Sequence, residues 1–576
     1  MKETTISTNN IAIMIDHYDR SDNVFTEKNL NAYIQKTLVQ NWDKEAFTDY
    51  KGATLLYRDV ARRIAKLHIL FEESGLKPGD RIALCGKNSS NWGTACIAAL
   101  SYGAVVVPIL HEFKADNIHH IINHSETKLF FAGDQIWENL NEASMPNVEG
   151  IITLDDYQLV ISRNEKLTYA REHLNELFGR KYPKEFKQKD ICFYEAGFDD
   201  LAMINYTSGS TGFSKGVMLP YRSLISNHLF ACRALYVMKP GDKIISMLPM
   251  AHMYGFSFEF FHEFLEGCHV FFLTRLPSPK IIFQALGEIN PMLIVSVPLV
   301  IEKIIKKNIL PKLETPSMKL LLKVPIVNDQ IKKKVCDEMI KGFGGNFYEV
   351  ILGGAAFNQE VEKFISSIHF PYTVGYGATE CGPIIAYDDK TTFAPGSCGK
   401  PVPNMEVKIL SNDPEHVPGE IICRGPNVML GYYKNEKLTE ETIDKDGWMY
   451  TGDLGIMDKE GNIFIKGRSK SLILGPSGQN IYPEEIEDHL NNMPLVNESV
   501  VISESDKLVA LVYPDFDEAL KTGMTDEQIA EVMEQNRVEL NNILPAYEKI
   551  SQIRIYHEEF EKTPKKSIKR FLYQKE

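Results

Sequence analysis

The sequence predicts an α/β protein with a large N-terminal domain and a small C-terminal domain. Strand-like apolar runs alternate with amphipathic helical patterns along most of the chain, which is typical of α/β folds. The 576 residues are 44% hydrophobic and 24% charged, a globular composition long enough for several domain-equivalents. The pattern changes near residue 468, and the segment beyond it can hold a small core of its own. We therefore expect domains at residues 1–468 and 469–576.

Several elements of the large domain can be placed from local signals. Residues 57–74 predict a helix that ends at Gly75, with a buried face made of Val60, Ile64, Leu67 and Phe71. Residues 81–85 and 104–108 predict buried strands. Asn358 can cap a helix whose buried stripe is Val361, Phe364, Ile365 and Ile368.

The C-terminal segment shows the same kinds of signal. Pro483 is suited to the first turn of a helix, with acidic residues beside it. Residues 499–502 and 508–512 predict strands. Thr525 and Gln528 predict a capping box for a helix that carries Ile529, Val532, Met533 and Leu540.

Charge and cysteine usage exclude some functions. The chain has 63 Lys plus Arg against 77 Asp plus Glu, a net charge of −14, which disfavours nucleic-acid binding but allows a local basic site. The nine cysteines form no CxxC pair and indicate reduced thiols. The N-terminus lacks a signal-peptide core, and the apolar stretch 93–110 is too interrupted for a membrane helix. We expect a soluble, cytoplasmic protein.

The strongest chemical motif is residues 206–216, which follow an apolar run. Small and hydroxylated residues there let the backbone wrap around phosphate oxygens, and Lys215 adds a positive charge. The motif is not a Walker A loop, because Gly216 follows the lysine. A flexible turn is the alternative. The candidate phosphate-binding residues are Thr207, Ser208, Gly209, Ser210, Thr211, Gly212 and Lys215.

Two further motifs suit a nucleotide. Residues 375–380 offer glycines for close approach, the hydroxyl of Thr379 and the carboxylate of Glu380, a hard ligand suited to Mg²⁺. Asp453 is followed by Arg468, and an aspartate with a nearby arginine can bind ribose hydroxyls. Each motif alone could be a turn.

In this order, the motifs resemble the acyl-adenylate-forming (AMP-binding) superfamily, and the closest subgroup is the long-chain fatty-acid CoA ligases. The resemblance also rests on residues 249–255, 353–356, 396–401, 431–433 and 478–487. It implies a large adenylate-forming domain of sheets flanked by helices, followed by a small, mobile α+β domain.

The resemblance implies a two-step reaction with ATP, Mg²⁺ and coenzyme A. A fatty-acid carboxylate forms an acyl-adenylate, and the thiol of coenzyme A then displaces AMP. The phosphate loop would hold the β- and γ-phosphates, Thr379 the α-phosphate, Glu380 the metal, and Asp453 with Arg468 the ribose. Gly354, Ala355 and Tyr376 would border the adenine, and His252 the acyl site. Lys470 would be the hinge, and Gly478 would line the path of the thiol.

One position departs from the family pattern. The family has an adenylation-promoting lysine four residues after a C-terminal threonine, but four residues after Thr563 stands Ser567. Lys565, Lys566 and Lys569 flank it, so a neighbour could substitute. The departure also leaves open the alternative that the chain is an acyl- or nucleotide-binding protein that has lost catalytic turnover. An enzyme that activates another acid, or loads a carrier protein, is the other alternative.

Other features have ordinary explanations. His120 and His124 are spaced as a zinc pair would be, but a helix surface explains them better because no third ligand is evident. Lysine runs at 306–307 and 332–334 suggest solvated helix faces, with a peripheral membrane contact as the weaker alternative.

If residues 257–266 are helical, Phe256, Phe260 and Phe264 share a face, which predicts core packing for most rings and a tunnel wall for one or two. Acyl length and oligomeric state are not fixed by the sequence.

Overall fold

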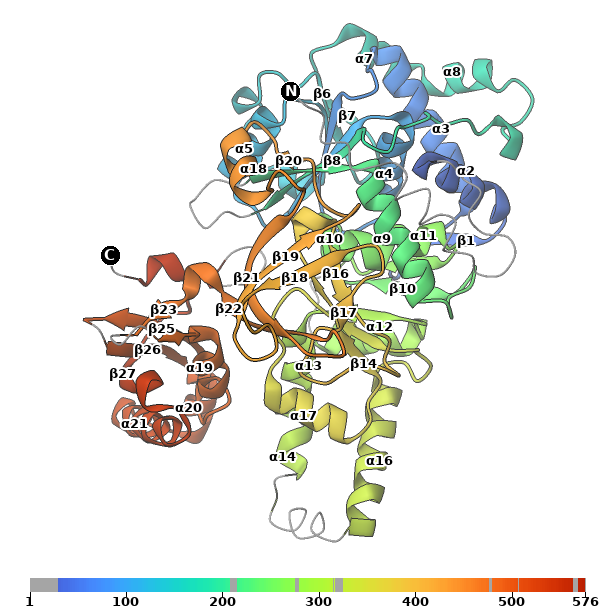
Figure 1. The fold of residues 1–576 in the computed structure, drawn as a ribbon. Helices are drawn as coiled ribbons and strands as arrows, with labels where there is room; N and C mark the ends of the chain where they lie inside the picture. Colours follow the sequence, from blue (N-terminus) through green and yellow to red (C-terminus); the bar gives the residue numbers. More distant parts are fainter. Residues whose placement is uncertain are drawn as a thin grey trace.

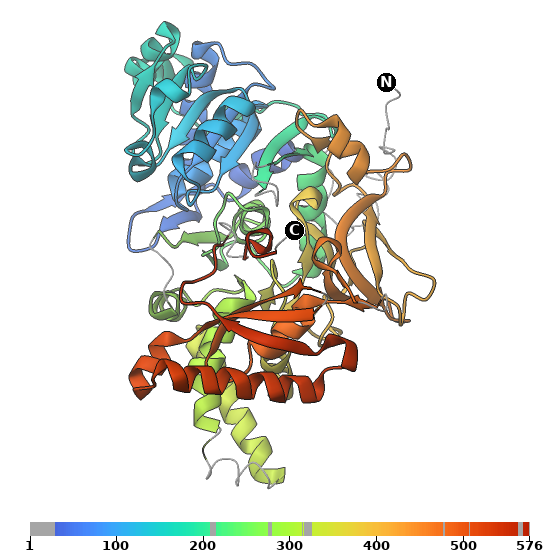
Figure 2. The same ribbon diagram turned by 90° about the vertical axis from the view of Figure 1, so that its left-hand side faces the viewer.

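The computed structural model describes residues 29–207, 215–274, 279–313, 315, 325–475, 479–505, 507–562 and 568–574. The fold is mixed α/β, with sheets and helices in a large N-terminal part and a smaller C-terminal part beside it (Figure 1). Turned by 90°, the C-terminal strands and helices lie across the lower half of the molecule (Figure 2). In the described part of the chain, no helix is both long enough and apolar enough to cross a membrane.

The largest sheet has eight strands and carries the phosphate-loop hairpin near one edge. Its central pairs are parallel, as expected for buried α/β strands, and antiparallel pairs close both ends. In spatial order the strands are β20 (Gly431–Tyr432), β9 (Lys215–Pro220), β8 (Leu201–Thr207), β4 (Val105–Ile109), β3 (Arg81–Cys85), β5 (Thr127–Ala132), β6 (Gly150–Thr153) and β7 (Leu159–Ser162).

Smaller sheets complete the N-terminal part. The first contains β10 (Lys243–Ser246), β11 (His269–Phe272), β1 (Glu45–Asp49) and β2 (Thr54–Leu56), and the second β12 (Ile294–Ser296), β13 (Val350–Leu352) and β14 (Tyr372–Val374). The third contains β15 (Tyr376–Gly377), β16 (Ile384–Tyr387) and β17 (Lys400–Pro401). The fourth, antiparallel, contains β18 (Glu406–Leu410), β19 (Gly419–Arg424), β21 (Met449–Met457) and β22 (Ile463–Arg468).

Helices cover these sheets. The longest of the first half, α3 (Tyr57–Ser74), ends at Gly75 in the left-handed conformation that glycine adopts without strain. The other N-terminal helices include α2 (Leu30–Gln40), α4 (Ser90–Tyr102), α5 (Ala115–His124), α6 (Asp134–Trp137), α7 (Glu165–Glu172), α8 (Leu174–Lys181), α9 (Tyr221–Ala234), α12 (Pro279–Ile289), α13 (Pro298–Ile304), α14 (Leu310–Leu313), α16 (Pro325–Gly342), α17 (Gln359–Ser367) and α18 (Glu436–Thr442).

The local signals in the sequence were accurate for the helix termini. The apolar face of α3 is buried as predicted, and each such side chain contributes about 1.5–3 kcal/mol. Asn358 caps α17, in which Val361 and Ile365 are buried but Phe364 is only half-buried. The second predicted strand begins and ends one residue later than expected, at Val105–Ile109.

The aromatic segment differs from the continuous α-helix expected at residues 257–266. A π-helical turn, η3 (Ser257–Phe261), separates α10 (Met253–Phe256) from α11 (His262–Leu265). The rings of Phe256, Phe260 and Phe264 are fully buried and pack with Phe47 and other core rings. These three rings are therefore core, which was the more ordinary of the two expectations.

The C-terminal segment has a core of its own. Its sheets contain β23 (Ile473–Leu474) with β24 (Asn480–Ile481), and β25 (Val496–Glu504), β26 (Lys507–Pro514) and β27 (Ile550–Ile555). Its helices are α19 (Pro483–Leu490), α20 (Phe516–Thr522) and α21 (Asp526–Ile543). Pro483 begins α19, and the capping box of Thr525 and Gln528 begins α21, as predicted. A buried apolar cluster joins residues from Ile481 to Ile550.

Candidate nucleotide site

The ends of the phosphate-loop hairpin are fixed by the large sheet. Thr207 ends β8 and Lys215 begins β9, and the two residues are paired across the hairpin. The predicted residues between them, Ser208, Gly209, Ser210, Thr211 and Gly212, lie outside the described residues. Both ends of the loop are therefore anchored at the same edge of the sheet, beside β20.

Lys215 lies among charged and aromatic groups that come from distant parts of the chain. Its ammonium is 5.3 Å from the ring centroid of Tyr432, a cation–π contact. Partial burial and the positive charge of Lys470 lower the pKa of Lys215, while the negative charge of Glu380 opposes that shift. Two lysines that are far apart in the sequence therefore lie near the carboxylate of Glu380, which suits a polyanionic ligand.

Glu380 is held by contacts that the sequence did not reveal. It lies in a short 3₁₀ turn, η5 (Thr379–Cys381), and its Oε1 accepts a hydrogen bond from the hydroxyl of Tyr432 at 2.9 Å. The backbone carbonyl of Glu380 accepts a second bond, from the amide of Met429 at 2.8 Å. Burial next to the carboxylate of Glu380 raises the pKa of Tyr432, so the phenol stays protonated and remains a donor.

Asn227 of α9 holds the segment that follows Glu380. Its side-chain amide donates to the carbonyl of Cys381 at 3.1 Å and accepts from the amide of Ile384 at 3.0 Å. Ser257 of η3 donates to the carbonyl of Gly382 at 3.0 Å. Helix α9 and the aromatic segment therefore both fix the turn that presents Thr379 and Glu380.

The predicted ribose-binding pair is brought together by the pairing of β21 with β22. Asp453 and Arg468 are opposite each other in register, and the Arg468 Nε lies 2.7 Å from Asp453 Oδ1. The hydroxyl of Tyr376 donates to Asp453 Oδ2 at 2.7 Å. Burial raises the pKa of Asp453, and Arg468 and Tyr376 oppose that shift by stabilising the carboxylate.

The remaining predicted residues border the same region or the aromatic segment. Gly354 and Ala355 follow β13 and are exposed, with Gly354 at a φ of 84°. His252 caps α10, and its Nδ1 accepts a hydrogen bond from the amide of Tyr254 at 3.2 Å. The hydroxyl of Tyr254 donates to the carbonyl of Ile351, next to the Gly354 turn. His252 therefore has a structural role as a cap, which does not conflict with a place at an acyl site.

The residues present fit a magnesium–nucleotide complex. Lys215 and Lys470 supply positive charge, and the Glu380 carboxylate supplies a hard oxygen ligand for Mg²⁺. Asp453 presents a buried, hydrogen-bonded carboxylate. In chemical terms, the arrangement can neutralise phosphates at one end and accept hydrogen bonds from ribose hydroxyls at the other.

Part of the predicted C-terminal machinery is not described. Gly478, Thr563, Lys565, Lys566 and Ser567 lie outside the described residues. Lys569 is described, and its ammonium forms an ion pair with Glu561. Lys470 lies in a short 3₁₀ turn, η6 (Ser469–Ser471), directly after β22.

Sequence reasoning missed Tyr432 and Asn227 as supporting residues. Tyr432 stood within a motif, at residues 431–433, but its bond to Glu380 spans 52 positions. His120 and His124 lie on α5, where their rings stack on each other, and His124 Nδ1 is 2.7 Å from the hydroxyl of Tyr206. Lys306 reaches the carbonyl of Asn491 at 3.4 Å, so that lysine contacts the C-terminal module.

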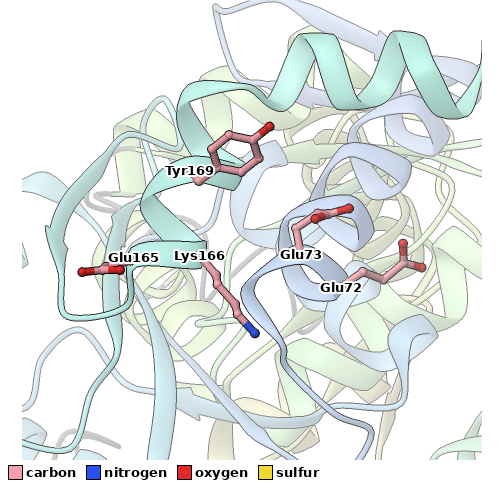
Figure 3. Close-up of a pocket in the computed structure, with 5 residues that line it drawn as sticks. All are labelled: Glu72, Glu73, Glu165, Lys166 and Tyr169. Carbon is pink, nitrogen blue, oxygen red and sulfur yellow. The ribbon is translucent and has the colours of Figure 1, made fainter.

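A surface hollow of about 450 Å³ lies elsewhere on the molecule (Figure 3). Its lining comes from the end of α3 and the start of α7, as Figure 3 shows: Glu72, Glu73, Glu165, Lys166 and Tyr169. None of these is a candidate site residue. An open, acidic hollow of this kind repels nucleotide phosphates, so it is a poor candidate for the nucleotide site.

Comparisons with known proteins agree with this geometry. The model of the AMP-binding enzyme family matches residues 34–433, and that of the AMP-binding enzyme C-terminal domain matches residues 470–576. A long-chain-fatty-acid–CoA ligase of Escherichia coli is 27% identical over 505 residues, covering 81% of this chain and 82% of that protein.

Solved structures share the fold. ATP-bound MatB from Rhodopseudomonas palustris has a TM-score of 0.73 at 22% identity, covering 94% of this chain and 98% of that one. The o-succinylbenzoate CoA synthetase of Bacillus subtilis, solved with its acyl-adenylate intermediate, has a TM-score of 0.72 at 19% identity, covering 95% of this chain and 98% of that one.

Proposed function

Because the chain belongs to the AMP-binding enzyme family, as an ATP-dependent, adenylate-forming acid–CoA ligase, we propose that the acid it activates is a fatty acid and that the residues around Lys215 and Asp453 form its active site. Its co-substrates are ATP, with Mg²⁺, and coenzyme A. The products are acyl-CoA, AMP and pyrophosphate.

The reaction needs no nucleophile from the protein. In the first step, a carboxylate oxygen of the acid attacks the α-phosphorus of ATP, and the bond to pyrophosphate breaks. In the second, the sulfur of coenzyme A attacks the acyl carbon, AMP leaves, and the thiol proton passes to solvent. The protein must hold two anions together and offset their repulsion, which is catalysis by proximity and by electrostatic stabilisation.

The assignment of roles follows the charges. Lys215 and the phosphate loop would bind the β- and γ-phosphates, Thr379 would bind the α-phosphate, and Glu380 would hold Mg²⁺, which would supply positive charge to offset that of the phosphates. Tyr432 keeps the Glu380 carboxylate oriented through its 2.9 Å hydrogen bond. Asp453 would accept hydrogen bonds from the ribose hydroxyls, and Arg468 opposes the rise in the pKa of Asp453 that burial causes.

One observation carries the proposal. The two predicted nucleotide-binding residues Asp453 and Arg468 are 15 positions apart, yet they form an ion pair, with the Tyr376 hydroxyl bound to the same carboxylate. A turn-capping aspartate would need neither partner. A buried carboxylate with an arginine and a phenol is instead well suited to bind a diol.

We further propose that the domains divide near residue 468 and that Lys470 is the hinge between them. The family models match on either side of this point, at 34–433 and 470–576. Contacts between the two parts include Asn358 with Asp488 at 3.0 Å and Lys466 with Glu485 at 3.0 Å. These contacts are polar rather than apolar, as is usual between domains that move relative to each other.

A fatty acid as the substrate is supported by the name of the Escherichia coli relative, and an aromatic acid is the competing candidate. The competing candidate is favoured by the Bacillus subtilis neighbour, whose acid is o-succinylbenzoate.

A thioester assay across acids tests the substrate. Acetate, hexanoate, decanoate, dodecanoate, palmitate, benzoate and o-succinylbenzoate are compared by kcat/KM for acyl-CoA formation. Each buried methylene contributes ~0.8 kcal/mol, so kcat/KM should rise about fourfold per methylene until the site is filled. A preference for benzoate, o-succinylbenzoate or acetate over dodecanoate would contradict the fatty-acid assignment and leave the ligase assignment standing.

A further inference from the structure

Two helices of the N-terminal part bring four metal-ligating side chains to one point. His228 and Cys232 are spaced i, i+4 on α9, and His262 and Glu266 are spaced i, i+4 on α11 and its C-terminal cap. Residues at this spacing lie on the same face of a helix. One ligand atom from each of the four residues lies within 4.8 Å of all the others.

The separations suit a single ion. The Nδ1 atoms of His228 and His262 are 3.0 Å apart, Cys232 Sγ is 3.9 Å from His228 Nδ1, and Cys232 Sγ is 3.0 Å from Glu266 Oε1. Zinc binds nitrogen at about 2.0–2.1 Å and sulfur at about 2.3 Å, so the ligand atoms of a tetrahedral site are about 3.3–3.8 Å apart. Small side-chain rotations would convert the observed contacts into that arrangement.

We propose that His228, Cys232, His262 and Glu266 form a closed, tetrahedral Zn²⁺ site that clamps α9 to α11. The choice of ion follows from the ligands, since two imidazoles, one thiolate and one carboxylate form a mixed set that zinc accepts. Four protein ligands leave no open position, which makes the site structural rather than catalytic.

Burial and charge support the proposal. His228, Cys232 and His262 are buried, and Glu266 is half-buried, so the ion enters from the side of Glu266. The Cys232 thiol loses its proton to solvent on binding, and the resulting thiolate and carboxylate together neutralise the two charges of Zn²⁺. A neutral complex avoids the cost of a net charge in the interior.

The surroundings hold the ligands in place. The ring of Tyr33, from α2, packs edge-on against the ring of His228 at 5.6 Å between centroids. Helices α2, α9 and α11 contact one another in pairs, and all three lie on the same side of the molecule in Figure 1. The site therefore sits where three helices meet.

The proposed zinc site lies next to the two segments that support the Glu380 turn. Asn227, which holds the segment after Glu380, directly precedes His228. Helix α11 ends the aromatic segment whose Ser257 binds the carbonyl of Gly382. A metal that fixes α9 against α11 would thus fix both supports of the Glu380 turn, and none of the four ligands would touch a substrate.

Metal content of the full-length protein tests the proposal. Protein from a zinc-supplemented culture is expected to retain about one zinc per chain after dialysis, and Cys232→Ser and His262→Gln are expected to lose nearly all of it. Cys192→Ser is the matched control, because Cys192 is exposed and outside the cluster. Wild-type protein without bound metal, or with iron or copper in place of zinc, would overturn the assignment.

A second measurement covers variants that fold poorly. Wild-type protein is stripped with a chelator, and Co²⁺ is added while the absorption spectrum is recorded. A thiolate-to-cobalt charge-transfer band with intense tetrahedral d–d bands is expected, together with a melting temperature several degrees above that of the stripped protein. Absence of these bands in folded, stripped wild-type protein, or their persistence in folded Cys232→Ser, would refute the site. Neither readout depends on ligase activity, so failure of the proposed function would not affect it.

Discussion

Replacing Asp453 with Asn tests the ribose-binding role most sharply. The substitution preserves shape but removes the charge that Arg468 and Tyr376 hold at 2.7 Å each. A hydrogen bond to a charged group contributes about 1.5–3 kcal/mol, and one between neutral groups contributes about 0.5–1.5 kcal/mol. The hydrogen bond from each ribose hydroxyl to residue 453 should therefore weaken by about 1–1.5 kcal/mol. Two hydroxyls together lose about 2–3 kcal/mol of binding free energy, which is a decrease of roughly 30- to 160-fold in kcat/KM for ATP.

The value of kcat/KM for ATP is obtained from acid-dependent exchange of pyrophosphate into ATP, measured over a range of ATP concentrations. Asp458→Asn is the matched control, because Asp458 only caps the turn between β21 and β22, where it accepts from the amide of Asn462 at 2.8 Å. The control should keep wild-type kinetics. If folded Asp453→Asn protein has an unchanged kcat/KM for ATP, Asp453 does not bind the ribose.

Three other perturbations follow from the structure. Lys215→Ala should slow pyrophosphate exchange by about 10²–10³ with stability changed by about 0.5 kcal/mol at most; unchanged exchange would remove Lys215 from the site. Lys470→Pro should affect adenylate and thioester formation unequally, measured as separate half-reactions, whereas equal losses would count against a hinge. Burial lowers the pKa of His68 to about 4. Between about pH 6.5 and 4 the imidazole of His68 is therefore protonated in the unfolded chain but neutral in the folded one. The free energy of unfolding should fall by about 3 kcal/mol as the pH falls through that range. Urea unfolding at several pH values should show this slope reduced in His68→Gln; an identical slope would show that His68 does not cause it.

Local signals in the sequence predicted the helix termini well. Gly75, Asn358, Pro483 and the pair Thr525–Gln528 all stand where helices begin or end. These signals work because capping depends on bonds between residues only a few positions apart. The contact of Asp453 with Arg468 could be anticipated only because both belong to recognisable motifs.

Contacts between distant residues were the part that sequence reasoning missed. The bond from Tyr432 to Glu380 and the bonds from Asn227 to the Glu380 segment depend on which strands and helices become neighbours, which no local pattern encodes. The same holds for His228, Cys232, His262 and Glu266: each i, i+4 pair was visible, but their meeting was not. The π-helical turn at Ser257–Phe261 was also missed, because it depends on how the aromatic segment packs against α9 and the core.

The central claim is that this chain forms an acyl-adenylate at the site around Lys215, Glu380 and Asp453. Acid-dependent exchange of labelled pyrophosphate into ATP, without coenzyme A, tests it most directly because it isolates the first step. We predict exchange with a fatty acid such as dodecanoate, requiring Mg²⁺ and strongly reduced in Lys215→Ala. Exchange that no acid stimulates, in folded protein that binds ATP, would contradict the account and indicate a nucleotide-binding protein without turnover.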